Sequence, residues 1–507
     1  MTVKLSRLLE NIDVIRLTGP ADGGVSGLAY DSRECRENFL FIALPGFRQD
    51  GHDFIPDAVA RGARYIVCEK KPAVPPGVTT ILVEDVRHVP GILGKVFYGD
   101  PTSALTLIGI TGTNGKTTVT YLLESILREA GHSVGVIGTV NYRYGTTLLP
   151  APYTTPQSID LQKILREMAD AGVTHVVMEV SSHAIDLGRI DDCVFDAGLF
   201  TNLSQDHLDY HHDMESYYEA KKRFFTEILG AGKMIVNADD PWGKRLIADT
   251  GKKVFTYGFA GDADAAVLRF RLSIDGTEAD MSAGKELWRV RSPLIGAFNL
   301  YNMIASAAAA AVLDIPGESI RRGIEAVRTI PGRIERVSGP DDPVVLVDYA
   351  HTEDALRKVL ETLREFRLRR IITVFGCGGD RDRSKRPLMG RAAVELSDIS
   401  IVTSDNPRRE DPLVIIEDIE RGIMEDRQVR RCDPGMLGDV SGGRAYTVIP
   451  DRKTAIATAV MLAGPEDIVL IAGKGHEDYQ IIGERKTFFD DRIIAREYLA
   501  ERPRKGG

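Results

Sequence analysis

The sequence predicts an α/β protein built from three domains. From residue 105 onward, short apolar runs alternate with helical patterns, which is typical of β-α-β units around a mostly parallel sheet. A second series of the same kind begins after Pro331-Gly332-Arg333, so a second sheet is expected there. The chain has 507 residues, whereas single hydrophobic cores usually stop growing near ~250–300 residues. We therefore expect separate cores rather than one large core.

The expected strands follow from these apolar runs. A segment containing Gly99 and Pro101 is a plausible linker, because Gly and Pro interrupt regular structure. We therefore place the domains at residues 1–100, 101–332 and 333–507. The expected strands span residues 39–43 and 65–67 in the first domain, 105–110, 133–137, 174–180, 197–200 and 234–236 in the second, and 344–347, 371–375, 399–403 and 468–472 in the third.

Composition and charge exclude several classes of protein. Lys and Arg number 64 and Asp and Glu number 73, so the formal net charge is −9. Nucleic-acid binders and membrane-surface proteins are usually basic, and we expect neither partner here. The N-terminus lacks the apolar run of a signal peptide, and the most apolar helical stretch, residues 305–313, is far shorter than the ~20 residues that span a bilayer. The five scattered cysteines are typical of reduced thiols. We expect a cytoplasmic protein that acts as a monomer.

A glycine-rich turn between a predicted strand and a predicted helix carries the clearest chemistry. Its glycines let successive backbone N–H groups point at one anion, its lysine can reach the β- and γ-phosphates of a nucleotide, and the following hydroxyl can bind Mg²⁺. The alternative is a glycine-rich turn that binds no ligand. The usual motif has glycine where Ile110 stands here, so the spacing departs from it. The turn comprises Gly112, Thr113, Asn114, Gly115, Lys116, Thr117 and Thr118.

This turn resembles the phosphate loop of the Mur ligase family, whose members use ATP to join an amino acid to a carboxylate. The resemblance implies ATP binding by the seven residues of the turn. It also implies a three-domain Mur ligase architecture, with a central P-loop ATPase domain and a C-terminal Rossmann-like domain. The related folylpolyglutamate synthetases usually carry Gly and then Ser after the lysine, so Thr117-Thr118 favours the cell-wall branch.

A carboxylate lies near the end of the apolar run at residues 174–180. Parallel strands place such residues beside the phosphate loop, although a solvent-facing glutamate is the alternative for Glu179. Its surroundings resemble the metal-binding strand of the family, which implies that Glu179 and His207 bind magnesium. Lys221 alone would be a solvated helix lysine, but its segment resembles the Y-x-x-A-K segment whose lysine is carbamylated. The resemblance implies catalytic roles for Lys116, Glu179, His207 and Lys221, with Thr117, Glu179, His207 and carbamylated Lys221 as metal ligands.

The nucleotide and the nucleotide-linked substrate have further contacts implied by the resemblance. Asn299, Arg333 and Asp348 match adenosine-binding positions, although each is also ordinary as a helix cap, a linker arginine or a strand-end aspartate. Glu353 stands where the family usually has proline. A uridine diphosphate-linked substrate would contact Ser32, Thr154, Thr155, Ser181 and Arg189. From the residues alone, two threonines before a proline are an extended loop.

Three strands of the third domain end in charged loops, at residues 376–381, 404–408 and 473–477. Parallel strands place these loops at one edge of a sheet, where their guanidinium, carboxylate and amide groups can converge. The D-N-P-R sequence at 405–408 resembles the motif of the diaminopimelate-adding members; a tight turn before a helix is the alternative. The resemblance implies diaminopimelate binding by Arg381, Asp405, Asn406, Arg408, Gly473 and Glu477.

The implied reaction is ATP-dependent ligation of meso-2,6-diaminopimelate to UDP-N-acetylmuramoyl-L-alanyl-D-glutamate through an acyl phosphate, a step in peptidoglycan precursor synthesis. ATP, Mg²⁺ and a CO₂-derived carbamate would be needed. The alternatives are a ligase that adds L-lysine, a folylpolyglutamate-type ligase and, from another class, a P-loop regulatory NTPase. The second charged α/β unit is not expected for a regulatory switch.

Overall fold

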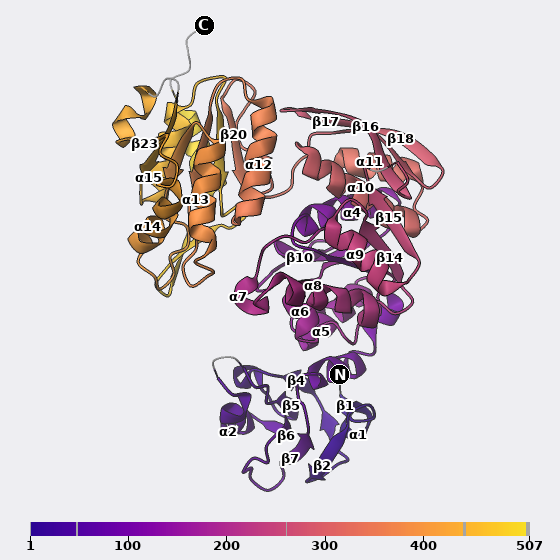
Figure 1. Cartoon of the computed structure of the whole chain (residues 1–507). Helices are drawn as coiled ribbons and strands as arrows, with labels where there is room; N and C mark the ends of the chain where they lie inside the picture. Colours follow the sequence, from indigo (N-terminus) through magenta and orange to yellow (C-terminus); the bar gives the residue numbers. More distant parts are fainter. Residues whose placement is uncertain (1, 47–48, 260, 440–442, 503–507) are drawn as a thin grey trace.

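The computed structural model describes residues 2–46, 49–259, 261–439 and 443–502. It contains three large sheets, one in each of the three expected ranges, and they follow one another along the molecule from the indigo N-terminal part to the yellow C-terminal part (Figure 1). The predicted α/β class with three cores is confirmed. The exact domain boundaries stay a prediction.

The N-terminal sheet has five strands in the order β2-β7-β6-β5-β4. Four of them pair in parallel, and β2 pairs antiparallel at one edge. Both strands expected here, at 39–43 and 65–67, are confirmed. The strands are β2 (Val14–Thr18), β4 (Gly27–Ala29), β5 (Phe39–Ile42), β6 (Ala63–Cys68) and β7 (Thr79–Val83), accompanied by the helices α2 (Ile55–Ala60) and α3 (Val89–Phe97).

The central sheet has eleven strands, and all five expected strands form its parallel middle. Antiparallel strands, which the sequence analysis did not predict, extend it at both ends. In sheet order the strands are β11 (Thr147–Pro150), β10 (Asn141–Tyr144), β9 (Val134–Ile137), β12 (His175–Glu179), β8 (Thr106–Thr111), β13 (Ala197–Phe200), β14 (Lys233–Asn237), β15 (Val254–Gly258), β16 (Ala265–Ser273), β17 (Gly276–Ala283) and β18 (Glu286–Ser292).

Helices cover the central sheet because each presents an apolar stripe to it. In α4 (Lys116–Glu129), the buried residues Val119, Leu122, Leu123 and Ile126 recur with the helical period. The alanine-rich α10 (Ala297–Val312) packs beside it, and so does α11 (Gly317–Ala326). No helix among the described residues is both long and apolar enough to cross a membrane. Other helices of this domain are α5 (Ser158–Asp170), α8 (Met214–Arg223) and α9 (Pro241–Thr250).

The C-terminal sheet has seven strands, six of them parallel, and includes all four expected strands. In sheet order they are β19 (Glu335–Arg336), β20 (Val344–Asp348), β25 (Ile468–Ala472), β21 (Ile371–Phe375), β22 (Ile399–Val402), β24 (Arg444–Val448) and β23 (Val429–Arg431). Its helices are α12 (Glu353–Phe366), α13 (Lys385–Leu396), α14 (Pro412–Ile423), α15 (Arg452–Leu462) and α16 (Asp491–Glu501), and a separate hairpin joins β26 (Tyr479–Ile482) to β27 (Arg485–Phe488).

The N-terminal domain is fixed to the central domain through α3 and α5. Ile159 of α5 belongs to the apolar core of the N-terminal domain, and Gly94 of α3 lies close to Gln162 of α5. The Tyr30 hydroxyl donates a 2.5 Å hydrogen bond to Asp160. Apolar packing and a polar contact therefore hold these two domains together.

Close packing between α4 and α11 generates a stability prediction. A Cβ atom on Gly323 would lie 2.3 Å from the Cα atom of Ile126, a backbone atom that cannot move aside alone. We expect Gly323→Ala to lower the free energy of unfolding by about 1–3 kcal/mol, as overpacking usually does. Chemical denaturation measures this. Gly435→Ala is the control, since its Cβ would meet no atom within 4 Å; equal effects of the two substitutions would contradict the packing argument.

Candidate active site

The predicted phosphate loop connects β8 to α4. Gly112 has φ 142° and Gly115 has φ 91°, backbone conformations that side-chain-bearing residues rarely adopt. A Cβ atom would lie 1.9 Å from the Thr201 hydroxyl oxygen at Gly112, and 2.4 Å from the Asn302 amide oxygen at Gly115. Both glycines are thus required by conformation and by space. The loop leads directly into the N-terminus of α4, where backbone N–H groups and the helix dipole favour an anion.

Lys116 folds back over this loop. Its Nζ donates to the carbonyl oxygens of Gly112 and Thr113, both at 2.8 Å. Burial lowers the pKa of Lys116, and the charges of Glu179 and Asp206 partly oppose that effect. A part-buried ammonium that is held by neutral carbonyl groups and, among the described residues, has no carboxylate in ion-pair contact is well prepared to bind a phosphate.

Glu179 lies at the end of β12 beside the loop, as its position in the strand predicts. Its side chain is almost fully buried and accepts hydrogen bonds from the Thr117 hydroxyl at 3.2 Å, the Thr139 amide at 3.0 Å and the Thr139 hydroxyl at 2.9 Å. The solvent-facing alternative for Glu179 is therefore wrong. Thr139, which the sequence analysis missed, holds the carboxylate toward the loop.

The donors near the loop fit Mg²⁺ better than a metal that needs many protein ligands. Glu179 and Thr117 offer oxygen atoms, and Mg²⁺ usually takes one or two carboxylates together with water and substrate phosphates. Within the described ranges, no group of three or more His, Cys, Asp or Glu side chains could enclose a metal ion. Phosphate oxygens would complete a site built on Thr117 and Glu179.

Lys221 of α8 is 1% exposed, so it is not the solvated helix lysine that its polar sequence suggests. Its Nζ donates to the Gly112 carbonyl oxygen at 3.0 Å and lies 4.7 Å from the centre of the Tyr217 ring. Among the described residues it has no carboxylate within ion-pair distance. Burial, followed by the charge of Lys116, lowers the pKa of Lys221 far below its usual value. Its amine is thus poised to lose its proton.

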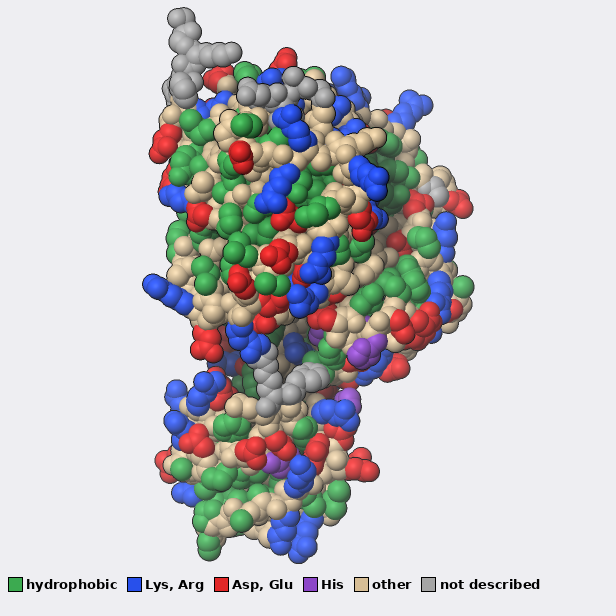
Figure 2. Space-filling view, turned by 60° about the vertical axis from the view of Figure 1, so that its left-hand side comes forward, with side chains coloured by type: hydrophobic (Ala, Val, Ile, Leu, Met, Phe, Trp, Pro, Cys, Tyr) green, Lys and Arg blue, Asp and Glu red, His purple; other side chains and the backbone are tan. Residues whose placement is uncertain are grey.

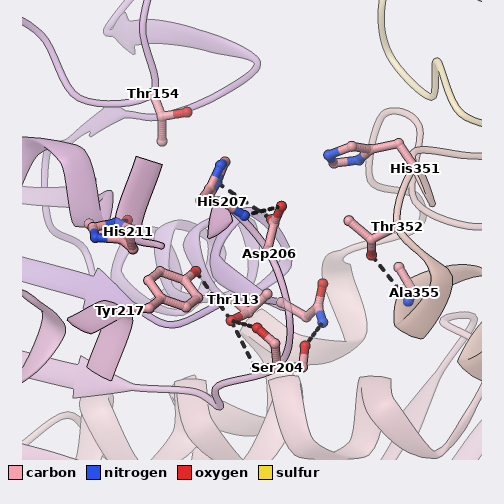
Figure 3. A network of polar contacts seen from close by, with 12 residues as sticks. Thr113, Thr154, Ser204, Asp206, His207, His211, Tyr217, His351, Thr352 and Ala355 are labelled. Atoms are coloured by element: carbon pink, nitrogen blue, oxygen red, sulfur yellow. Dashed lines mark hydrogen bonds and ion pairs between the residues drawn. The ribbon is translucent and has the colours of Figure 1, made fainter. Parts of the chain in front are cut away.

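His207 lies at the opposite side of the pocket from His351 (Figure 3). Its backbone is left-handed, with φ 55°, and its ring nitrogen Nε2 lies 3.5 Å from Asp206. Desolvation in the pocket lowers the pKa of His207 to about 3 despite the opposing charge of Asp206, although 46% of the His207 side chain is exposed. Nδ1 of His351 lies 2.9 Å from the Tyr349 carbonyl oxygen, and burial lowers the pKa of His351 to about 4. Both imidazoles are therefore neutral near pH 7, the form that can bind a metal.

The C-terminal domain contributes directly to the phosphate loop. Arg333 donates to the Thr117 hydroxyl at 3.2 Å and lies over the Tyr349 ring, 4.8 Å from its centre. Asp354, at the start of α12, accepts hydrogen bonds from the side-chain amide of Asn114 at 3.1 Å and from the Ser204 hydroxyl at 2.8 Å. Asp354 was not predicted from the sequence, because its role depends on packing between two domains.

Two of the three predicted adenosine contacts lie at the pocket. Arg333 and Asp348 line it, although Asp348 already accepts hydrogen bonds from the Ile334 and Ala350 amides, each at 2.7 Å. Asn299 is buried within α10, where it donates to Ile295 and accepts from Asn302. Asn299 does not line the pocket, and its contact with ATP stays a prediction.

The pocket gathers most of the predicted phosphate, metal and substrate residues. Gly112, Thr118, Thr155, Arg189 and Ser32 do not line it. The predicted residues that line it are Thr113, Asn114, Gly115, Lys116, Thr117, Thr154, Glu179, Ser181, His207, Lys221, Arg333 and Asp348; those that the sequence analysis missed are Thr139, Ser182, Asp206, Tyr217, Tyr349, Ala350, His351, Thr352 and Ala355.

The residues predicted for the nucleotide-linked substrate fall into two groups. Near the pocket, the Thr155 hydroxyl donates to the Glu179 carbonyl oxygen at 2.8 Å, and Arg189 donates to the Thr155 carbonyl oxygen at 3.2 Å. Ser32 belongs to the N-terminal domain, where it donates to Asp57 at 2.8 Å. Figure 2 shows a hollow between the N-terminal domain and the rest of the molecule, with Lys and Arg side chains at its rim. An elongated anionic substrate could lie across this hollow.

The three charged loops of the C-terminal domain converge, as predicted from the parallel strands. Asn406 donates to Glu477 at 2.9 Å, Arg408 donates to the Gly379 carbonyl oxygen at 2.8 Å, and the Cβ position of Gly473 is 3.3 Å from Asp405. Arg381 is exposed at the same edge of the sheet. Burial of Arg408 lowers the pKa of Arg408, and the nearby charge of Arg381 lowers it further. Two guanidinium groups therefore lie near a pair of carboxylates.

A buried arginine and a buried lysine, both missed by the sequence analysis, connect these loops. Arg386 is fully buried and binds Glu410 at 2.9 Å and Asp418 at 2.9 Å. Glu410 in turn accepts from the Asp380 amide at 2.6 Å, which ties the 376–381 loop to the segment after Arg408. The lysine is Lys474, whose Nζ contacts Asp405, Asn406 and Glu477.

Comparison with protein families covers most of the chain. Residues 24–98 match the family described as Mur ligase family, catalytic domain. Residues 110–310 match the Mur ligase middle domain, and residues 332–475 match the Mur ligase, glutamate ligase domain. These three matches follow the three sheets in order.

Individual relatives agree with the family matches. A UDP-N-acetylmuramoyl-L-alanyl-D-glutamate--2,6-diaminopimelate ligase from Geobacter metallireducens is 46% identical over 494 residues, covering 95% of this chain and 96% of that protein. The ligase of the same name from Solibacter usitatus is 44% identical over 506 residues, covering 98% of each. A solved structure of a ligase with that name has a TM-score of 0.69 and 32% identity over 99% of both chains. This chain belongs to the Mur ligase family and has its three-domain α/β architecture.

Proposed function

We propose that this chain is an ATP-dependent acid–amino-acid ligase that joins meso-2,6-diaminopimelate to UDP-N-acetylmuramoyl-L-alanyl-D-glutamate, in peptidoglycan precursor synthesis. The observation that carries the proposal is the combination of a phosphate loop beside the Glu179 carboxylate in the central domain with a charged loop cluster at the edge of the adjacent C-terminal sheet. Relatives bearing the name of that ligase over nearly the whole chain support it.

The proposed chemistry begins with a carboxylate that is a poor electrophile. An oxygen of the D-glutamyl γ-carboxylate attacks the γ-phosphorus of ATP, ADP leaves, and an acyl phosphate forms. The amine of diaminopimelate then attacks the acyl carbon, the C–O bond to the phosphate breaks, and the amine loses a proton as the amide forms. The task of the protein is mainly positioning and electrostatic stabilisation, for which Lys116 is placed at the loop.

We assign the nucleotide phosphates to the loop 112–118, with Arg333 and Asp348 nearby. Bound Mg²⁺ would offset negative charge on the phosphates, and Thr117 and Glu179 are the side chains suited to hold it. His207 and a carbamate on Lys221 would serve a second ion. The buried amine of Lys221, which has no carboxylate in ion-pair contact among the described residues, supports the carbamate, because only a neutral amine adds CO₂.

The two organic substrates are assigned to opposite sides of this pocket. The UDP portion would contact Ser32 in the N-terminal domain, and the dipeptide would approach Thr154, Thr155, Ser181 and Arg189. Diaminopimelate would lie at the edge of the C-terminal sheet, with its distal carboxylate near Arg381 and Arg408 and its distal ammonium near Asp405 and Glu477. We propose that the protein acts as a monomer in the cytoplasm, without nucleic-acid or membrane partners.

The alternatives differ in what the acceptor loops would bind. The substrate of an L-lysine-adding ligase, L-lysine, has no distal carboxylate that could pair with Arg381 and Arg408. A folylpolyglutamate-type ligase does not need the D-N-P-R segment. A regulatory NTPase would hydrolyse ATP without either substrate, and the C-terminal loop cluster would have no role in it.

Phosphate release from ATP is expected to require both the UDP-linked dipeptide and diaminopimelate. Lys116→Ala should reduce the rate by at least about two orders of magnitude, because it removes a charge that stabilises the transferred phosphoryl group. A coupled phosphate assay with each substrate omitted in turn measures both effects. Substantial ATP turnover with neither substrate present would favour the regulatory NTPase.

Lys221→Ala is expected to abolish turnover, and short carboxylic acids are expected to restore part of it, because their oxygens can replace those of the carbamate. Protein equilibrated with ¹³C-bicarbonate should show a carbamate ¹³C signal that is lost in Lys221→Ala. Lys222→Ala is the matched control, since Lys222 is the neighbouring lysine and pairs with Glu219 on the surface. A carbamate signal that persists in Lys221→Ala would refute the assignment.

The enzyme is expected to prefer meso-diaminopimelate over L-lysine by roughly 10⁴–10⁵ in kcat/KM, as sites built for a polar group reject analogues that lack it. Arg408→Ala should raise the KM for diaminopimelate and reduce the ratio of the kcat/KM values for diaminopimelate and L-lysine. The reason is that a guanidinium binds a carboxylate through two charge-assisted hydrogen bonds. Arg409→Ala is the control, since Arg409 is exposed and pairs with Asp380. Use of lysine within tenfold of diaminopimelate would show that the D-N-P-R interpretation is wrong.

A further inference from the structure

Lys474 follows β25 and is completely buried among the predicted acceptor residues. Its Nζ lies 3.3 Å from Oδ1 of Asp405, 3.2 Å from Oδ1 of Asn406 and 3.4 Å from Oε2 of Glu477. One ammonium thus contacts three of the side chains that the family resemblance assigns to diaminopimelate. Lys474 itself had no predicted role.

The amide of Asn406 is largely occupied by protein contacts. Its Nδ2 donates to Glu477 at 2.9 Å, and its Oδ1 accepts from the Ile481 amide at 3.0 Å as well as from Lys474. Asn406 is therefore suited to orient Glu477 rather than to bind the ligand itself. Lys474 touches Oδ1 of Asp405 and Oε2 of Glu477, so the second oxygen of each carboxylate lies outside the lysine contact.

We infer that Lys474 is a positioning residue for the acceptor amino acid: its ammonium holds the Asp405 and Glu477 carboxylates together so that their second oxygens can bind the distal ammonium of diaminopimelate. This inference rests on the proposed function. It adds to the residues predicted to bind diaminopimelate a lysine that holds two of them in place without touching diaminopimelate itself.

The charge balance of the cluster explains why a lysine is needed. Two carboxylates in one buried site repel each other, and without a cation one of them takes up a proton. Burial and the charge of Asp405 raise the pKa of Glu477, whereas Lys474 lowers it. A protonated carboxyl group would no longer attract a ligand ammonium, so the buried cation preserves the charge that the ligand requires.

The other charged groups around the cluster do not replace this cation. Arg452 is fully buried but forms a 2.6 Å ion pair with Asp491. Arg408 donates to the Gly379 carbonyl oxygen, and His351 is kept neutral by burial. The hydroxyl groups of Tyr349 and Tyr479 also face the cluster and carry no charge near pH 7, because burial raises the pKa of Tyr479 to about 12 and that of Tyr349 further.

Kinetics of Lys474→Met test the inference. The KM for diaminopimelate should rise about 30-fold or more, because removing one partner of a buried charge pair leaves the others uncompensated. The KM values for ATP and the UDP-linked dipeptide should stay within about threefold, since those substrates are assigned elsewhere. Lys453→Met is the control, as Lys453 is an exposed lysine paired with Glu497. An unchanged KM for diaminopimelate, or equal losses for all three substrates, would overturn the inference.

Two further variants keep the test decisive if Lys474→Met folds poorly. Lys474→Gln keeps a hydrogen-bond donor without the charge, and it should still raise the KM for diaminopimelate. Lys474→Met combined with Glu477→Gln removes one charge of each sign and should recover thermal stability, but not the KM. Recovery of the KM in the double variant would overturn the inference, because the Glu477 charge would then be unnecessary. Failure of the unmodified protein to use diaminopimelate would instead refute the proposed function.

Discussion

Contact between the C-terminal domain and the phosphate loop is the constraint on which the rest of the site depends. Arg333 reaches Thr117 and Asp354 reaches Asn114, so the pocket has walls from two domains. Each domain alone offers only part of it: the central sheet supplies the loop and Glu179, and the C-terminal sheet supplies Tyr349 and His351. Parallel strands explain this arrangement, because they gather the functional loops at one edge of each sheet. Joining two such edges forms a pocket lined by both domains, and its walls would shield the proposed acyl phosphate from part of the solvent.

The electrostatics of the pocket are balanced for a substrate that brings negative charge. The part-buried Lys116 and the buried Lys221 both donate to the carbonyl oxygen of Gly112, although two ammonium groups at one acceptor repel each other. Burial lowers the pKa of both lysines. A phosphate would stabilise Lys116 in its charged form, whereas loss of the proton from Lys221 would relieve the repulsion. The same geometry therefore favours different roles for two lysines that share a hydrogen-bond acceptor.

Much of the fold was predictable, because parallel strands that are buried on both faces leave continuous apolar runs. The strand β16 was not predicted, because Arg269 and Arg271 interrupt its apolar run, and its Leu268 and Phe270 are half-exposed rather than buried. The phosphate loop and Glu179 were predictable from their positions in the chain, because the loop follows one predicted strand and Glu179 lies near the end of another. Lys221 has a polar local sequence, and only packing of α8 against the loop buries it. Asp354 and Lys474 act through contacts between segments distant in sequence, which local patterns do not encode.

The central claim is that the chain activates a carboxylate by transferring a phosphoryl group to it. Isotope transfer tests this claim most directly. The UDP-linked dipeptide would be prepared with ¹⁸O in its D-glutamyl γ-carboxylate and incubated with ATP, Mg²⁺ and diaminopimelate. The account predicts that each released phosphate carries one ¹⁸O atom, because the carboxylate oxygen leaves with the phosphate when the amide forms. Release of unlabelled phosphate while the amide product forms would contradict it.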